Sequence, residues 1–190
     1  MSNEMWENDE GKFWTVKDLA ERVSLDVSDE GISRTIRQLR HWTENDVLRT
    51  VGEKKSGKGI PRLYHPEPTM EISAFLIELA RYGVTVDAMK MVADELWDTD
   101  EGFMAVSTAL TDVPSMLQLS WTFDPGTGKF QSASLSLFDE QELLHGAQKF
   151  EHDRYMDFTA TSSILVNMTA VLERVYERHR AIQADKTDTE

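Results

Sequence analysis

Residues 32–42 read Ile-Ser-Arg-Thr-Ile-Arg-Gln-Leu-Arg-His-Trp, and their spacing predicts a helix with two distinct faces. Apolar side chains at positions 36, 39 and 42 turn toward a core, whereas Arg34, Arg37 and Arg40 project from the neighbouring face. Arginine presents forked donors to guanine edges and phosphates, and a helix fits the major groove of DNA. The run therefore predicts a recognition helix. The alternative is a solvated surface helix that carries some basic residues.

A shorter helix precedes this run. Thr15 is its predicted N-cap, with Asp18 placed three residues on as in a capping box. Its buried stripe comprises Val16, Leu19, Ala20 and Val23. We expect residues 24–31 to form a turn or a short extra piece of helix, and the second helix to run from about Ser33 to Asp46. Helix, turn and second helix with outward arginines follow the helix-turn-helix order.

Two short apolar runs, Val47–Val51 and Ile60–Tyr64, flank a loop rich in glycine and lysine. This pattern predicts a β-hairpin that would form a wing beside the two helices, with Lys54, Lys55 and Lys58 near the DNA backbone. The alternative is a glycine-rich loop kept soluble by lysine. The loop lacks the spacing of a nucleotide-binding P-loop.

The charge distribution is uneven. The whole chain carries a formal net charge of −14. Residues 12–64 hold 11 Lys+Arg against 8 Asp+Glu, a net +3, and residues 31–64 alone reach +5. The rest of the chain therefore carries −17. Local neutralisation of phosphates dominates DNA affinity, so a basic patch on an acidic protein can still bind DNA, with a steep salt dependence.

The sequence also argues against several other classes of protein. It contains no cysteine, which excludes disulfides, thiolate zinc sites and cysteine nucleophiles. No apolar run is long enough to cross a bilayer, and we expect a cytoplasmic location. The common hydrolase, zinc-protease and dinucleotide motifs are missing, so we expect no enzymatic activity and no cofactor. His145 and His152 are two helical turns apart and more typical of exposed histidines than of a metal site.

Two further helices should follow the hairpin. The first runs from Met70 to Tyr82, with Thr69 as its cap and Gly83 at its end. The second follows Thr85, which caps it, and continues to about residue 96. Its predicted buried positions are Val86, Met89, Val92, Ala93 and Leu96.

Residues 13–96 resemble the DNA-binding domain of the MerR superfamily of transcription regulators. Four pieces carry the resemblance: Trp-Thr-Val-Lys-Asp-Leu-Ala at 14–20, Gly-Ile-Ser-Arg-Thr-Ile-Arg at 31–37, Arg-Leu-Tyr at 62–64, and Leu-Ala-Arg-Tyr-Gly-Val-Thr-Val-Asp-Ala-Met at 79–89. Two features depart from the family pattern: about seven extra residues around 24–30, and Gln38-Leu39 where a pair of aromatic residues is usual.

The resemblance implies that Arg34, Thr35 and Arg37 face the groove or its phosphates, and that Arg62 and Tyr64 anchor the wing. Tyr64 has an alternative as a packed aromatic residue. The full set of candidate DNA-binding residues is Arg34, Thr35, Arg37, Arg40, His41, Lys54, Lys55, Lys58, Arg62 and Tyr64.

The predicted fold class is mainly α with small β-hairpins. A disordered segment (1–11) precedes a winged helix-turn-helix domain (12–98), then an α+β regulatory or dimerisation region (99–184) and a disordered tail (185–190). Residues 117–123 and 130–138 alternate between apolar and polar side chains around a turn, which predicts a second hairpin. Short helices are expected near 103–110 and 139–150.

The last helix should run from Thr161 to about Gln183. Its apolar residues follow a three-four spacing that suits either a dimer seam or a helix laid across the hairpin of the same chain. The candidate dimerisation residues are Leu165, Met168, Leu172, Val175, His179 and Ile182.

Together these patterns predict a homodimeric, sequence-specific regulator that binds double-stranded DNA. One alternative is a protein-interaction module, such as an antirepressor, whose acidic C-terminal region engages a basic partner. Another is a sensor in which the hairpin over residues 121–138 lines a small-molecule pocket.

Overall fold

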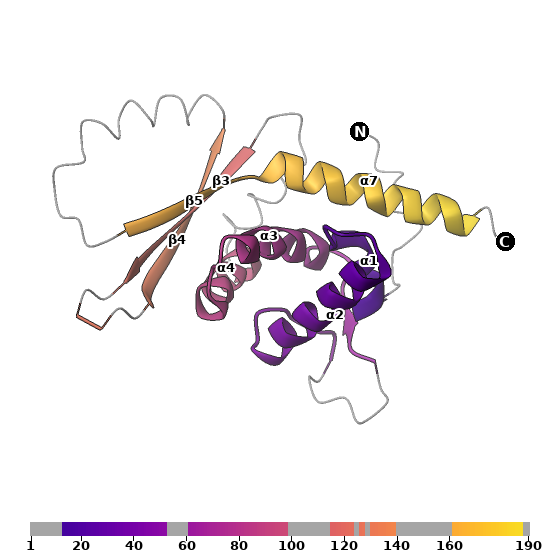
Figure 1. Cartoon of the computed structure of the whole chain (residues 1–190), viewed down its shortest axis with the longest axis horizontal. Coiled ribbons are helices and arrows are strands. Elements are labelled where there is room, and N and C mark those ends of the chain that lie inside the picture. The colour runs from indigo at the N-terminus through magenta and orange to yellow at the C-terminus, as the bar shows by residue number, and fades with distance from the viewer. Residues whose placement is uncertain are drawn as a thin grey trace.

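The computed structural model describes residues 13–52, 61–98, 115–123, 126–127, 130–139 and 161–187. The described part of the chain is mainly helical, with two small antiparallel sheets (Figure 1). Figure 1 shows α7 as a long helix over α1 and α3, with the larger sheet standing near the point where α7 begins. The expected segments 1–11 and 103–110 lie outside the described residues, as does the helix expected near 139–150 except for Asp139, which is the last residue of a strand.

The first helix begins where the sequence predicts, and a short strand that was not predicted precedes it. β1 (Trp14–Thr15) leads into α1 (Val16–Val23), and the capping box is present: the Thr15 side chain accepts from the Asp18 N–H, and the Asp18 carboxylate accepts from the Thr15 N–H. This reciprocal pair satisfies two backbone donors at the helix start. The other face of α1 contributes Leu19, Ala20 and Val23 to the core.

The second helix, α2 (Asp29–Glu44), begins earlier than predicted. Ser28 is its N-cap and accepts from the Gly31 N–H at 3.1 Å. The connection between α1 and α2 is therefore residues 24–28, and only the last two residues of the insertion expected around 24–30 belong to the helix. A Cβ on Gly31 would lie 2.4 Å from the Asp26 carbonyl oxygen, so glycine is what lets the connection fold against the helix.

The predicted strand over Val47–Val51 does not form. Val47 and Leu48 are buried, and a single backbone hydrogen bond, from the Val51 N–H to the Leu63 carbonyl at 2.8 Å, joins this segment to β2 (Leu63–Tyr64). β2 pairs instead with β1. The tip of the expected wing, residues 53–60, lies outside the described residues.

α3 (Thr69–Arg81) and α4 (Val86–Asp98) match the predicted pair closely. Thr69 is the first residue of α3 and not its cap, since Pro68 occupies the cap position without a side-chain hydrogen bond. Gly83 has a φ of +75° and ends α3. Thr85 caps α4 through the Ala88 N–H at 3.4 Å. α3 is buried along almost its whole length, so it forms the centre of the core.

The second hairpin is confirmed and gains a third strand. β3 (Ser115–Phe123) lies between β4 (Phe130–Asp139) and β5 (Thr161–Asn167), all antiparallel, with Leu117 opposite both Leu137 and Val166. The sequence predicted a helix from Thr161, and this is wrong for residues 161–167, which form β5. Only at Met168 does the helix α7 (Met168–Thr187) begin, and it continues beyond residue 184, where we expected a disordered tail.

One hydrophobic core joins both halves of the chain. α7 packs against α1, α3 and β3, and α4 lies beside β4. Buried residues of the core come from every described helix and from β3 and β5. The long helix predicted for the regulatory region is therefore part of the packing of the N-terminal helices.

Candidate nucleic-acid interface

The exposed face of α2 is the candidate site. Arg34, Arg37 and Arg40 are all exposed, as is His41 at the end of the helix. The opposite face buries Leu39, Trp42 and Thr43 against the core, which fixes the rotation of the helix about its axis. The arginine spacing thus predicted correctly which side of the helix meets solvent.

The three arginines differ in their surroundings. Arg34 lies 3.4 Å from Glu30, one turn earlier on the same helix, and both side chains are largely exposed. A pair of this kind is weak and easily exchanged for another anion. Within the described residues, Arg37 and Arg40 have no hydrogen-bond or ion-pair partner. These two guanidinium groups are therefore the ones most available to a phosphate or a base edge.

Two of the predicted contact residues are buried. Thr35 donates to the Ser24 hydroxyl at 3.0 Å, inside the junction of α1 and α2. Tyr64 is fully buried with its hydroxyl 2.8 Å from that of Thr43, and burial raises its pKa. Thr35 therefore does not belong to the exposed face, which corrects the prediction. Tyr64 is the packed aromatic residue of the alternative interpretation.

The remaining wing residues are only partly described. Arg62 is partly exposed and lies 3.6 Å from Glu44, at the end of α2. Lys54, Lys55 and Lys58 lie outside the described residues, so their role at the tip of a wing stays a prediction.

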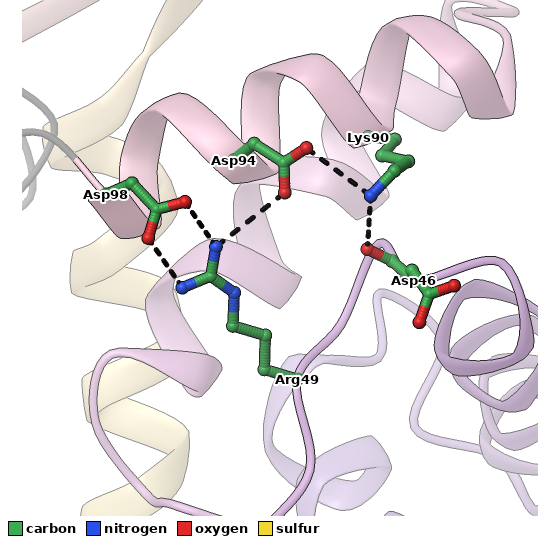
Figure 2. Close-up of polar contacts among 5 residues, drawn as sticks. All are labelled: Asp46, Arg49, Lys90, Asp94 and Asp98. Atoms are coloured by element: carbon green, nitrogen blue, oxygen red, sulfur yellow. Dashed lines mark hydrogen bonds and ion pairs between the residues drawn. The ribbon is translucent and has the colours of Figure 1, made fainter. Parts of the chain in front are cut away.

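An exposed polar network that the sequence analysis missed connects the segment after α2 to α4 (Figure 2). Arg49 donates two hydrogen bonds to Asp98, at 2.7 and 2.5 Å, and lies 3.7 Å from Asp94. Lys90 bridges Asp94, at 3.4 Å, and the backbone carbonyl of Asp46, at 3.2 Å. The signal was present in the sequence, because residues 90, 94 and 98 lie one helical turn apart.

This network changes the charge available to a partner. The two hydrogen bonds from Arg49 lower the pKa of the Asp98 carboxyl, which keeps the aspartate ionised. Arg49 also lies 5.4 Å from the centroid of the Trp97 ring. Arg49 is one of the positive charges counted in residues 31–64. Its guanidinium is already paired with Asp94 and Asp98, so this charge is less available to an external anion. Within the described part of residues 31–64, the arginines without a carboxylate partner are therefore Arg37 and Arg40, both on α2.

The predicted dimer seam is mostly interior. Met168, Leu172, Val175 and His179 are buried within their own chain, so they cannot meet a second copy, and the heptad interpretation is corrected. Leu165 belongs to β5 and is 42% exposed, and Ile182 is partly exposed. The three-four spacing of apolar residues correctly identified the buried face of α7. It did not show that α1, α3 and β3 of the same chain cover this face.

Polar contacts accompany this packing where α7 crosses the end of α1. Arg22 is buried and donates from Nε to Nδ1 of His179 at 2.9 Å, with its guanidinium 4.1 Å from the centroid of the Trp14 ring. Arg178 donates to the Ser24 carbonyl at 2.6 Å. Sequence reasoning gave no sign of these contacts, because they join residues more than 150 positions apart.

Other classes of site find no support in the described residues. These residues contain no cluster of three or more histidine or acidic side chains that could hold a metal ion. His145 and His152 fall outside the described part. Every described helix falls short of the length or the apolar character that a membrane crossing requires. Comparison of the sequence with models of known protein families and with curated proteins found no match in either case.

Proposed function

We propose that the chain is a transcription regulator that binds double-stranded DNA through α2, within a MerR-like winged helix-turn-helix head. One observation carries the proposal: Arg34, Arg37 and Arg40 line the exposed face of a helix whose other face is held in the core. Arginines spaced in this way can contact guanine edges and phosphates along a groove. The net +5 of residues 31–64 gives the local attraction that DNA binding requires.

We propose further that the chain acts as a homodimer, because paired half-sites are the common way in which a single short helix gains specificity. The partner surface is not the buried face of α7. It belongs to other parts of the molecule, with the partly exposed Leu165 and Ile182 as remaining candidates from the original set.

A selection from random duplex DNA, followed by affinity measurements on the recovered sequence, tests the proposal. Arg37→Ala and Arg40→Ala should each weaken binding by about 1–3 kcal/mol if the side chains reach bases. The matched control is Arg180→Ala, which removes the same charge from an exposed position on α7. If the α2 variants bind as well as the control, α2 is not the DNA-binding helix.

The second candidate is a protein-interaction module. It is favoured by the carboxylates that accompany three basic residues of the head: Glu30 beside Arg34, Asp98 beside Arg49, and Glu44 beside Arg62. Together with the −17 outside residues 12–64, this suits a basic protein partner. Failure to recover any duplex, combined with saturable binding of a basic DNA-binding domain, would favour this candidate.

A further inference from the structure

α7 reaches the connection between α1 and α2 through two consecutive residues. His179 accepts a hydrogen bond from Arg22, in the last turn of α1, at 2.9 Å. Arg178 donates to the carbonyl of Ser24, the C-cap residue of α1, at 2.6 Å. A charged donor makes the second bond stronger than a neutral one. The C-terminal helix thus contacts the point where the chain leaves α1.

Ser24 connects α7 to α2, because it is hydrogen-bonded to residues of both helices. Its hydroxyl donates to the Asp26 carbonyl at 2.6 Å and accepts from Thr35 at 3.0 Å. Its N–H donates to Ala20 at 3.0 Å. Ser24 is 4% exposed, so each of its polar groups is used within the protein. Thr35 stands between the exposed Arg34 and the core-facing residues of α2, which makes it the link between the connection and the arginine face.

We infer that Arg178 and His179 are positioning residues for α2: α7 sets how the arginine face is presented by holding the α1–α2 connection through Ser24. Since α7 continues directly from β5, a displacement of the larger sheet would be carried to the same connection (Figure 1). The inference gives the C-terminal region a route by which it regulates DNA binding. Its effect on DNA rests on the proposed function, whereas its effect on α2 does not.

The alternative is that these contacts only contribute to global stability. The two roles differ in where a substitution is felt. Loss of global stability increases hydrogen exchange in every element that opens by global unfolding, including α3. Loss of a positioning contact increases exchange first at the α1–α2 connection and in the initial turns of α2. The amides of Gly31 and Ile32, both bonded to Ser28, report on that region.

The experiment compares Arg178→Ala with Arg180→Ala, which removes the same charge from the same helix without a contact to the connection. Arg178→Ala should increase exchange at residues 29–35 relative to α3 and weaken binding of the selected duplex by roughly 2- to 30-fold, the range of coupling effects at residues that do not touch the ligand. Thr35→Val should reproduce both effects. The double variant should be less than additive, because both changes act through Ser24.

The outcomes separate the two hypotheses. If Arg37→Ala leaves DNA binding unchanged but Arg178→Ala still loosens residues 29–35, the DNA proposal fails and the positioning role stands. If Arg178→Ala and Arg180→Ala give the same exchange at residues 29–35 and the same affinity, the positioning role is wrong. Uniform exchange across α2 and α3 in Arg178→Ala also overturns it, since that pattern reports global stability alone.

Discussion

Glu71 carries an acidic side chain into the interior between α3 and α7. It is 2% exposed, and one carboxyl oxygen accepts a hydrogen bond from the Tyr176 hydroxyl, while the other has no hydrogen-bond partner among the residues that the structure describes. Burial raises the pKa of Glu71 to about 7; the hydrogen bond from Tyr176 opposes the rise, and nearby Glu67 adds to it. Burial also raises the pKa of Tyr176. The pair therefore favours the neutral form of both groups.

This pKa makes folding stability depend on pH. The folded state binds the Glu71 proton more tightly than the unfolded state, where the ordinary value is 4.5. Its contribution to stability is therefore complete below about pH 4.5 and is lost as pH rises through about 7. We expect Glu71→Gln to remove this loss, making the protein more stable than wild type at pH 8 by on the order of 3 kcal/mol and little changed at pH 5.

Urea unfolding at pH 5 and pH 8 measures the effect. The control, Glu177→Gln, removes a carboxylate from an exposed position of α7, next to Tyr176, and should leave the pH profile as in wild type. If Glu71→Gln keeps the wild-type dependence between these pH values, the carboxyl of Glu71 does not titrate in that range.

At the scale of elements, α2 and α3 end in the same way with different residues. In α3, the Gly83 N–H donates to Ala80 and the Val84 N–H to Leu79, at 3.1 and 3.4 Å. In α2, the Asp46 N–H donates to Thr43 at 3.3 Å, and the next N–H donates to Trp42 at 2.9 Å. Both are Schellman motifs. Gly83 has a φ of +75°, which suits glycine, whereas Asp46 has a φ of 59°, which costs an L-residue free energy.

Asp46→Gly should therefore stabilise the protein, by about 0.5–1 kcal/mol, because glycine adopts a positive φ without a steric penalty. The hydrogen bond from Lys90 goes to the backbone carbonyl of residue 46 and survives the change. The mirror-image variant, Gly83→Asp, should destabilise by a similar amount, since nothing lies within 4 Å of a Cβ there and only the backbone conformation matters. Thermal unfolding of both variants tests the pair; a loss of stability in Asp46→Gly would refute it.

Local signals explain which elements could be predicted. The capping box of Thr15, the glycine that ends α3 and the alternating strands β3 and β4 each depend on neighbours in sequence. The start of α2 was missed although Ser28 is followed by two acidic residues, because Gly31 resembles a helix breaker. β5 was missed because residues 164–168 also fit a helical spacing. Pairing with β3 decides between the two, and no local pattern contains that information.

At the scale of the whole molecule, the candidate site was predictable only where local sequence patterns determine it. Periodicity identifies Arg34, Arg37 and Arg40 as outward-facing, since one face of the helix must be apolar. It cannot show that Thr35 is covered by the α1–α2 connection, or that α7 covers the head instead of a second copy. Both depend on contacts between segments distant in sequence.

Leu172→Ala tests the packing of α7. The side chain is 1% exposed in the core, so its truncation should cost about 2–5 kcal/mol of unfolding free energy. Because the cost arises within one chain, the change in midpoint should be the same at all protein concentrations, and the mass by light scattering should not change. Glu173→Ala, at the next and exposed position, is the control. If Leu172→Ala instead causes a dimer to dissociate without unfolding, the buried face of α7 forms the dimer interface after all.

The position of α7 has a practical consequence for anyone who wishes to transplant the arginine helix. A fragment cut after α4 would lose the cover over α1 and α3, and Arg22 would lose its histidine partner. Such a fragment would expose an apolar surface to water and would tend to aggregate. A fragment designed to carry α2 must therefore include α7.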